Sequence, residues 1–436
     1  MRFAKIEKSI HVVKAVLAIC VVSMTAFVAG CGGGGGGGGD GGGSSSSSSG
    51  ASNAPNQQPI AANAPNTVAV TVDRGVANLI NIPTVSVTIC QPGTPPSSNT
   101  CTTVDHVLLD TGSFGVRIVN SALGSLASAL PIQQATAGGQ LAECTHFADG
   151  FTWGTTRTAT VQVSGEVASN IPIQVIGDLD ASTIPSGGCI NGAAENTAQT
   201  LGANGIIGIG VAPFDCGAAC AVQANVAQFS NYYACTGTNC VRTLAELSKQ
   251  VANPVPNFAA DNNGVIVQMA PISANGQASA TGTVVFGIGT QSNNGQEQGI
   301  TTFTTDASGD LVNSKFNGAT TNTFMDSGSN GYFFQDGSMP LCTGNLASFY
   351  CPATTQQRTV TLVGANGVTG NVLLNVANTQ NLLSAGSNFA FNDLGGQIGS
   401  LSAFDLGLPF FFGRHVYYGM DKRASGGQAP FVAFPL

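Results

Sequence analysis

The chain has 436 residues, a formal net charge of −8 and only 8% charged residues, so its solubility depends largely on uncharged polar side chains. The acidic balance leaves no basic patch that could neutralise phosphates, and we expect no nucleic-acid binding. A chain of this length suits one large domain or two medium domains.

The first thirty residues have the pattern of an export signal. A basic start is followed by an apolar run from Ala15 to Val28, which is short for a membrane span. The run ends in Val28-Ala29-Gly30-Cys31, which resembles the lipobox of bacterial lipoproteins, where the cysteine is acylated. The alternative is an ordinary cleavage site beside a chance cysteine. We predict a lipoprotein signal peptide over residues 1–30 and a lipid anchor on Cys31.

Residues 31–67 consist mainly of glycine, serine, asparagine and proline. Such a segment cannot bury apolar surface, so we expect a flexible tether between the lipid and the body of the protein. Because Gly32 gives no inner-membrane retention signal, we expect anchoring in the outer membrane, facing the periplasm or the exterior.

The remaining chain alternates short β-branched runs with glycine, asparagine and aspartate, which is typical of strands and turns. Helical periodicity is modest and confined to Ser121–Ala129 and Thr243–Gln250. The pattern predicts an all-β fold. The expected strands are Thr67–Val72, Val85–Cys90, Val104–Leu109, Arg157–Val163, Ile171–Ile176, Gly264–Met269, Thr283–Phe286, Thr359–Val363 and Gly370–Val376.

Cysteine usage agrees with export. Of twelve cysteines, Cys20 and Cys31 belong to the signal region, and the other ten are an even number that suits disulfides in an oxidising compartment. Eight of them lie in pairs close in sequence, which leaves Cys144 and Cys189; the pairing itself stays open. The body has no C-x-x-C pair and few histidines, so we expect no metal site and no cofactor.

One motif occurs twice in matching surroundings. Leu108-Leu109-Asp110-Thr111-Gly112-Ser113 and Phe324-Met325-Asp326-Ser327-Gly328-Ser329 both read as two apolar residues, aspartate, a hydroxyl residue, glycine and serine. Two facing carboxylates that share one proton can supply both the base and the acid for peptide hydrolysis. We therefore expect Asp110 and Asp326 to be catalytic, with activity rising towards acid pH.

The neighbours of each aspartate have expected supporting roles. Thr111 and Ser327 can form hydrogen bonds between the two loops, and Ser113 and Ser329 can hold the outer carboxylate oxygens. Gly112 and Gly328 allow a sharp turn that presents backbone N–H groups to the carboxylates.

The repeated motif resembles that of the pepsin-like aspartic peptidases, over roughly residues 75–436. The resemblance implies two β lobes, residues 68–255 and 256–436, around a cleft that binds a peptide or protein substrate, in a monomer. Ile206-Ile207-Gly208 and Phe411-Phe412-Gly413 are similar to the family segments beneath the two loops. Trp153-Gly154 stands where the family has the Tyr-Gly of its flap, although Trp153 could equally be a buried hairpin residue.

The chain also departs from the family pattern. The family tryptophan that supports the flap is missing, and Phe114-Gly115-Val116-Arg117 follows the first motif instead. A serine hydrolase is disfavoured because no Gly-x-Ser-x-Gly is present. Two functions remain: a tethered aspartic endopeptidase, which we favour, and a catalytically inactive cell-surface binding or adhesion lipoprotein that keeps the fold.

Overall fold

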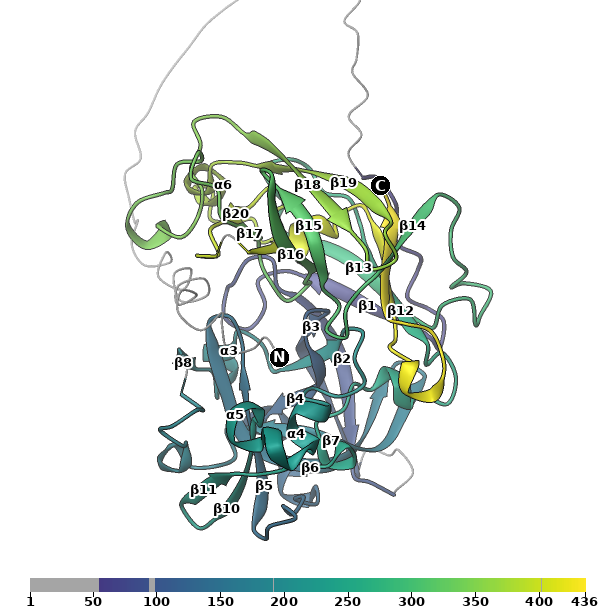
Figure 1. Cartoon of the computed structure of the whole chain (residues 1–436), viewed down its shortest axis with the longest axis vertical. Helices are drawn as coiled ribbons and strands as arrows, with labels where there is room; N and C mark the ends of the chain where they lie inside the picture. The colour runs from purple at the N-terminus through teal and green to yellow at the C-terminus, as the bar shows by residue number, and fades with distance from the viewer. Residues whose placement is uncertain (1–54, 94–98, 191, 401) are drawn as a thin grey trace, which may run out of the picture.

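The computed structural model describes residues 55–93, 99–190, 192–400 and 402–436 (Figure 1). The expected signal peptide, Cys31 and most of the expected tether lie outside the described residues. The regular structure of the described chain consists mainly of strands, in two lobes that Figure 1 shows one above the other. The prediction of an all-β, two-lobed protein is confirmed.

The strands form three groups. The N-terminal lobe contains β2 (Pro83–Cys90), β3 (Cys101–Asp110), β4 (Phe114–Val119), β5 (Gln140–His146), β6 (Gly150–Val163), β7 (Glu166–Ile176), β8 (Ala193–Ala194), β9 (Gly205–Ile209), β10 (Tyr232–Thr236) and β11 (Asn239–Arg242). The C-terminal lobe is a seven-stranded sheet of β15 (Leu311–Phe316), β16 (Ala319–Met325), β17 (Tyr332–Phe334), β18 (Gln356–Val363), β19 (Thr369–Val376), β20 (Gly395–Gly396) and β21 (Ala403–Leu406). Between them lie β1 (Thr67–Val72), β12 (Gly264–Met269), β13 (Ala280–Phe286), β14 (Ile300–Thr304), β22 (His415–Gly419) and β23 (Phe431–Pro435).

The helices are all short, with three to five residues each. The α-helices are α1 (Asn120–Leu123), α2 (Leu126–Ala129), α3 (Ala198–Leu201), α4 (Ala218–Ala221), α5 (Val226–Phe229) and α6 (Thr379–Leu383). Shorter 3₁₀ turns are η1 (Ala181–Thr183), η2 (Gln223–Asn225), η3 (Leu247–Lys249), η4 (Val255–Asn257), η5 (Gly344–Leu346), η6 (Leu408–Phe410) and η7 (Arg423–Ser425). The helix expected over Ser121–Ala129 is thus divided at Gly124, which has a φ of 57°. The helix expected over Thr243–Gln250 is reduced to one 3₁₀ turn.

Each strand expected from the sequence falls within an observed strand. The hairpin of β18 and β19 shows the physical reason, because inward and outward side chains alternate along both strands. Val360 and Leu362 on β18 and Val372 and Leu374 on β19 are buried, whereas most of the residues between them are more exposed. An antiparallel sheet with one solvated face requires this alternation.

A single sheet connects the two lobes. The path of this sixteen-stranded sheet runs from β11 in the N-terminal lobe through β1 to β14. Strand β1 pairs along its whole length with β13, from Thr67 opposite Val285 to Val72 opposite Ala280, and its end pairs with β2. The two halves of the sequence therefore share a hydrogen-bonded sheet, and the expected boundary at residue 255 does not separate independent sheets.

The end of the expected tether is part of the folded body. The backbone N–H of Gln57 donates to Gly413 O (2.9 Å), and the N–H of Ile60 donates to Gln268 Oε1 (2.8 Å). Asn66 is buried and its side chain donates to Phe286 O (3.0 Å). Residues 55–66 are thus held by backbone and amide hydrogen bonds, which a composition that is poor in apolar residues does not reveal.

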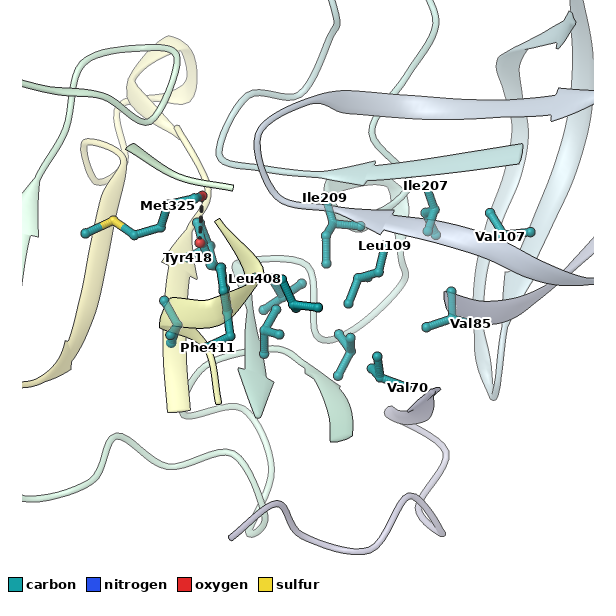
Figure 2. Close-up of a cluster of buried hydrophobic side chains, with 14 of the residues drawn as sticks. Val70, Val85, Val107, Leu109, Ile207, Ile209, Met325, Leu408, Phe411 and Tyr418 are labelled. Atoms are coloured by element: carbon teal, nitrogen blue, oxygen red, sulfur yellow. Dashed lines mark hydrogen bonds between the residues drawn. The ribbon is translucent and has the colours of Figure 1, made fainter. Parts of the chain in front are cut away.

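The hydrophobic core is continuous beneath both motif loops. Leu109 and Ile207 from the N-terminal half belong to the same buried cluster as Met325, Leu408 and Tyr418 from the C-terminal half (Figure 2). The Tyr418 hydroxyl donates to the backbone oxygen of Met325 (3.0 Å), the residue that precedes Asp326. The second motif is thereby fixed against a core that both halves of the chain build.

All ten cysteines of the described residues form disulfides: Cys90–Cys101, Cys144–Cys189, Cys216–Cys220, Cys235–Cys240 and Cys342–Cys351. The expectation of disulfides is confirmed, and Cys144 and Cys189 pair with each other. This number of disulfides suits an extracellular or cell-envelope protein. Within the part of the chain that the structure describes, no helix has the length and apolar character needed to cross a membrane.

Candidate active site

The two motifs lie at the ends of equivalent strands. Strand β3 ends at Asp110, and β16 ends at Met325, directly before Asp326. Beside β3, the parallel strand β9 places Gly208 opposite Asp110. Beside β16, the parallel strand β21 places Leu406 opposite Met325, and Leu406 O accepts from the Asp326 N–H (3.1 Å). Each aspartate therefore lies at the end of a pair of parallel strands in its own lobe.

The two carboxylates are held in the same way. The Gly112 N–H donates to Asp110 Oδ1 (2.8 Å), and the Ser113 hydroxyl donates to Asp110 Oδ2 (2.5 Å). In the second loop, the Gly328 N–H donates to Asp326 Oδ1 (2.7 Å), and the Ser329 hydroxyl donates to Asp326 Oδ2 (2.8 Å). The structure thus brings together the aspartate, glycine and serine of each motif.

The glycines of the motifs are required by close approach. A Cβ on Gly112 would lie 2.5 Å from Asp326 Cγ, and a Cβ on Gly328 would lie 2.9 Å from Asp110 Cγ. Neither glycine has a positive φ. The expected reason for these glycines, a sharp turn, is therefore secondary to the space that the opposite carboxyl group occupies. The same distances place the two carboxyl groups face to face.

Hydroxyl groups join the two loops beneath the carboxylates. Thr111 Oγ1 donates to Met325 O (3.1 Å) and accepts from the Ser327 N–H (2.9 Å). Ser327 Oγ donates to Leu109 O (2.7 Å) and accepts from the Thr111 N–H (3.1 Å). Both side chains are buried. The predicted bonds between the loops are present and form a closed, symmetric set.

The electrostatics of the pair favour one retained proton. Burial, followed by the charge of Asp110 and a hydrogen bond with it, raises the pKa of Asp326 to about 8. Two carboxylates at this separation cannot both ionise readily, because the second negative charge is repelled in a poorly solvated site. At neutral pH the pair therefore contains both a proton donor and a group able to accept a proton.

A cleft opens beside the two aspartates. One wall is largely apolar and belongs to the N-terminal half, and the other belongs to the C-terminal half and carries more polar groups. The lining residues are Leu108, Asp110, Phe147, Ala148, Asp149, Ile206, Asp326, Gly328, Ser329, Asn330, Phe333, Gln397, Ile398 and Asp405.

The prediction that Trp153 and Gly154 form the flap is wrong. Trp153 is 0% exposed near the start of β6, where its indole N–H donates to Thr183 Oγ1 (2.9 Å) and its ring packs edge-on against Tyr233. A Cβ on Gly154 would lie 1.9 Å from Val175 O, so this glycine serves the pairing of β6 with β7. The alternative, a buried hairpin tryptophan, is the correct interpretation.

The turn between β5 and β6 reaches the cleft instead. The Phe147 N–H donates to Gly150 O (2.8 Å) and closes a tight turn whose residues Phe147, Ala148 and Asp149 line the cleft. Phe147 is the aromatic residue at this tip, and it was missed because a single phenylalanine between His146 and Ala148 carries no motif.

Arg117 holds this hairpin to the first motif. Its guanidinium donates to Phe114 O (2.8 Å) just after the Asp110 loop, and to Thr145 Oγ1 (2.9 Å) and Glu143 Oε1 (2.7 Å) on β5. All of Arg117 and Glu143 is buried. Burial acts to raise the pKa of Glu143, but Arg117 lowers it below its ordinary value. At the place of the missing family tryptophan, an ion pair connects the hairpin to the loop.

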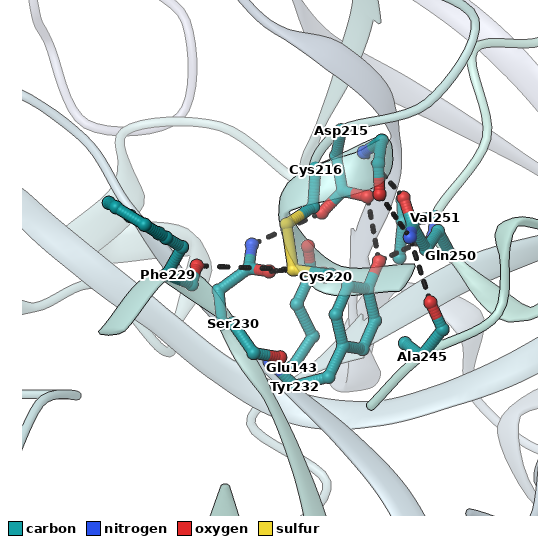
Figure 3. The surroundings of a disulfide bond; sticks show 12 residues. Glu143, Asp215, Cys216, Cys220, Phe229, Ser230, Tyr232, Ala245, Gln250 and Val251 are labelled. Atoms are coloured by element: carbon teal, nitrogen blue, oxygen red, sulfur yellow. Dashed lines mark hydrogen bonds between the residues drawn. A yellow bond between two sulfur atoms is a disulfide. The ribbon is translucent and has the colours of Figure 1, made fainter. Parts of the chain in front are cut away.

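A disulfide-closed turn completes this buried network (Figure 3). Cys216–Cys220 closes the turn that begins beside Asp215, and Asp215 accepts from the Tyr232 hydroxyl (2.7 Å) and from Arg117 (3.3 Å). The Tyr232 hydroxyl in turn accepts from the Val251 N–H (2.7 Å). The cysteine-rich segment therefore acts on the site indirectly, by packing behind the strands that carry it.

The segment beneath the second loop also differs from the prediction. The register shows that Ile206-Ile207-Gly208 corresponds to Asp405-Leu406-Gly407, because each segment runs parallel to the strand that ends at the motif. Phe411 packs in the common core, and Gly413 lies against Pro55. The search for two apolar residues before glycine missed the true counterpart, because Asp405 interrupts that pattern.

Among the described residues, no group of three or more histidine, cysteine, aspartate or glutamate side chains could hold a metal ion. The fold and the site together define a class of protein: an all-β protein of two lobes, with two facing Asp-hydroxyl-Gly-Ser loops between the lobes.

Within that class, residues 62–434 match the model of the family described as "Protein of unknown function (DUF3443)", and the chain belongs to this family. Among solved structures, it is similar to an aspartic proteinase from Irpex lacteus, with 16% identity, a TM-score of 0.44, and coverage of 85% of this chain and 96% of that chain. No curated protein gives a significant match.

Proposed function

We propose that the protein is an aspartic endopeptidase that is exported and tethered to the cell envelope by a lipid on Cys31. The observation that carries this proposal is the facing pair Asp110 and Asp326, with matching hydrogen bonds on each carboxylate and one pKa raised to about 8. A protein that only binds ligands has no need of two carboxyl groups that repel each other.

The electrostatics of the pair support a division of roles. Asp326, with its raised pKa, keeps the proton and acts as the acid, while Asp110 acts as the base. A water molecule between them loses a proton to Asp110 as it attacks the peptide carbonyl carbon, and Asp326 protonates the carbonyl oxygen. The resulting tetrahedral intermediate collapses when one of its hydroxyl groups returns a proton to Asp326, the C–N bond breaks, and the amine leaves with the proton that Asp110 holds.

The cleft supports an extended peptide as the substrate. Leu108, Phe147 and Ile206 offer an apolar wall on one side of the carboxyl pair, and Asn330 and Gln397 offer polar groups on the other. The hairpin tip with Phe147 is in a position to cover a bound chain. Its phenylalanine has no hydroxyl group, so any hydrogen bond from this tip to the substrate must come from another atom.

The test is cleavage of a denatured protein mixture by the purified protein from about pH 4 to about pH 9. We expect cleavage that falls as the pH passes about 8, where Asp326 loses its proton, and that statine-type inhibitors block. Asp110→Asn and Asp326→Asn should each abolish it, whereas Asp105→Asn, an exposed carboxylate on the same strand as Asp110, should not. A folded parent protein that cleaves nothing would favour the cell-surface binding protein instead.

A further inference from the structure

The C-terminal wall of the cleft contains two buried oxygen atoms without hydrogen-bond partners. Asp405 on β21 and Asn330 just after the second motif are each 4% exposed, and both line the cleft. Asp405 Oδ1 and Asn330 Oδ1 lack a donor in the structure. Buried acceptors of this kind are destabilising unless a donor is supplied, so two of them in one wall indicate that a ligand supplies it.

In the opposite wall, the position equivalent to Asp405 is occupied by an apolar residue. In the N-terminal lobe Ile206 pairs with Leu108, and in the C-terminal lobe Asp405 pairs with Phe324, at the equivalent position of the equivalent strands. Ile206 is buried in an apolar cluster that includes Leu108. Asp405 therefore places a carboxyl group where the other lobe has an apolar side chain, which indicates a role in binding rather than in packing.

The charge of the cleft indicates the kind of donor. Asp110, Asp149, Asp326 and Asp405 all line it, and the lining residues that the structure describes include no lysine, arginine or histidine. Burial and the neighbouring charge of Asp326 raise the pKa of Asp405 well above its usual range. A cation placed beside Asp405 would offset both effects, because it stabilises the ionised carboxylate.

Asp405 is also linked to the reacting group. The Ser329 hydroxyl donates to Asp326 Oδ2 (2.8 Å), and the proximity of Ser329 to Asp405 partly offsets the rise in the pKa of Asp405. Phe333 and Ile398 line the cleft on the same side and are largely buried, so they offer apolar surface to the methylene stem of a long side chain.

We propose that this wall is a specificity site for a basic residue of the substrate, in which Asp405 and Asn330 accept hydrogen bonds from a lysine or arginine side chain next to the cleaved bond. The inference rests on the proposed peptidase function for the cleavage, but the recognition of a cation can be measured without it. The proposal requires that the preference for a basic residue depend on Asp405 itself and not on the total negative charge of the cleft.

The experiment uses peptides that are identical except for one residue, which is either lysine or norleucine, placed in turn on each side of the cleaved bond. Norleucine keeps the carbon stem and removes the charge. The parent protein, Asp405→Asn and Asp405→Ile are compared for kcat/KM, where Asn preserves the volume of the side chain and Ile reproduces its counterpart in the other lobe. Binding of the same peptides to Asp110→Asn, alone and combined with Asp405→Asn, is measured by calorimetry.

We expect the lysine peptide to be favoured about tenfold or more at one of the two positions, in kcat/KM and in Kd, and we expect both Asp405 variants to reduce that ratio to about one. Asp149→Asn is the matched control, since it removes a carboxylate from the hairpin tip of the same cleft. If it reduces the ratio as much as Asp405→Asn does, the preference comes from total charge and the proposal is overturned.

The two proposals fail separately. Cleavage of both peptides without a preference for lysine, or with a preference that Asp405→Asn leaves intact, overturns the specificity site and leaves the peptidase standing. Tighter binding of the lysine peptide that depends on Asp405, in a protein that cleaves neither peptide, supports the specificity site and overturns the peptidase. Absence of binding by either peptide overturns the specificity site.

Discussion

Replacing Thr111 by valine should measurably destabilise the protein. Valine has nearly the same shape but lacks the oxygen that donates to Met325 O and accepts from the Ser327 N–H. The carbonyl of Met325 keeps its bond from Tyr418, whereas the buried N–H of Ser327 loses the partner that the structure gives it. One lost hydrogen bond and one buried unpaired N–H together correspond to a decrease in the free energy of unfolding of about 2–3 kcal/mol.

Urea unfolding at neutral pH measures this loss as a shift of the midpoint. The matched control is Thr103→Val, because Thr103 is exposed on β3 and its hydroxyl pairs only with that of Thr88 across the strand surface (2.8 Å). The control should change the free energy of unfolding by about 0.5 kcal/mol or less. Equal midpoints for Thr111→Val and Thr103→Val would refute the reasoning, because they would show that the bonds between the loops do not stabilise the fold.

Three further predictions concern charge, disulfides and burial. Because the pKa of Asp326 is raised to about 8 in the folded protein, the stability that its proton contributes is complete below its ordinary pKa and is lost as the pH rises to about 8; the melting temperature should fall over that range, and less steeply in Asp326→Asn. Replacing Cys144 and Cys189, which are 45 residues apart, by alanine should lower the free energy of unfolding by about 4 kcal/mol in urea titrations, and an unchanged midpoint would contradict this. The only tryptophan, Trp153, should emit at short wavelength and resist quenching by acrylamide, with no change when a peptide fills the cleft; strong quenching would show that it is exposed.

The strands and the pair of aspartates could be predicted because their signals are local. The strands that the sequence predicts are rich in β-branched residues and are separated by segments with glycine, asparagine or aspartate, and Asp110 and Asp326 lie in two copies of one short motif. Two copies of the motif in similar surroundings indicate two equivalent loops. The reciprocal hydrogen bonds between Thr111 and Ser327 confirm that the two loops are equivalent.

The rest of the site depends on register and long-range packing, which the sequence does not display. Asp405 corresponds to Ile206 only through strand pairing, and an aspartate inside an apolar pattern conceals the relation. The residue type of Trp153 predicted a place at the cleft, but its ring packs against Tyr233 in the interior, while the turn at Phe147 reaches the aspartates. Similarly, Arg117 and Glu143 are 26 residues apart in sequence and form an ion pair only because the fold brings β4 and β5 together, so the sequence alone does not indicate their contact.

The pairing of β1 with β13 has a consequence for how the chain acquires its fold during export. Asn66, just before β1, bonds to Phe286, which lies 220 residues further along, so under the proposed export the first strand would leave the membrane long before its partner strand has crossed. Until then its open edge is available to other unpaired strands. We therefore expect that a chain cut after residue 255 aggregates. If the proposed export is correct, the protein should become resistant to proteases only when nearly all of it has crossed the membrane.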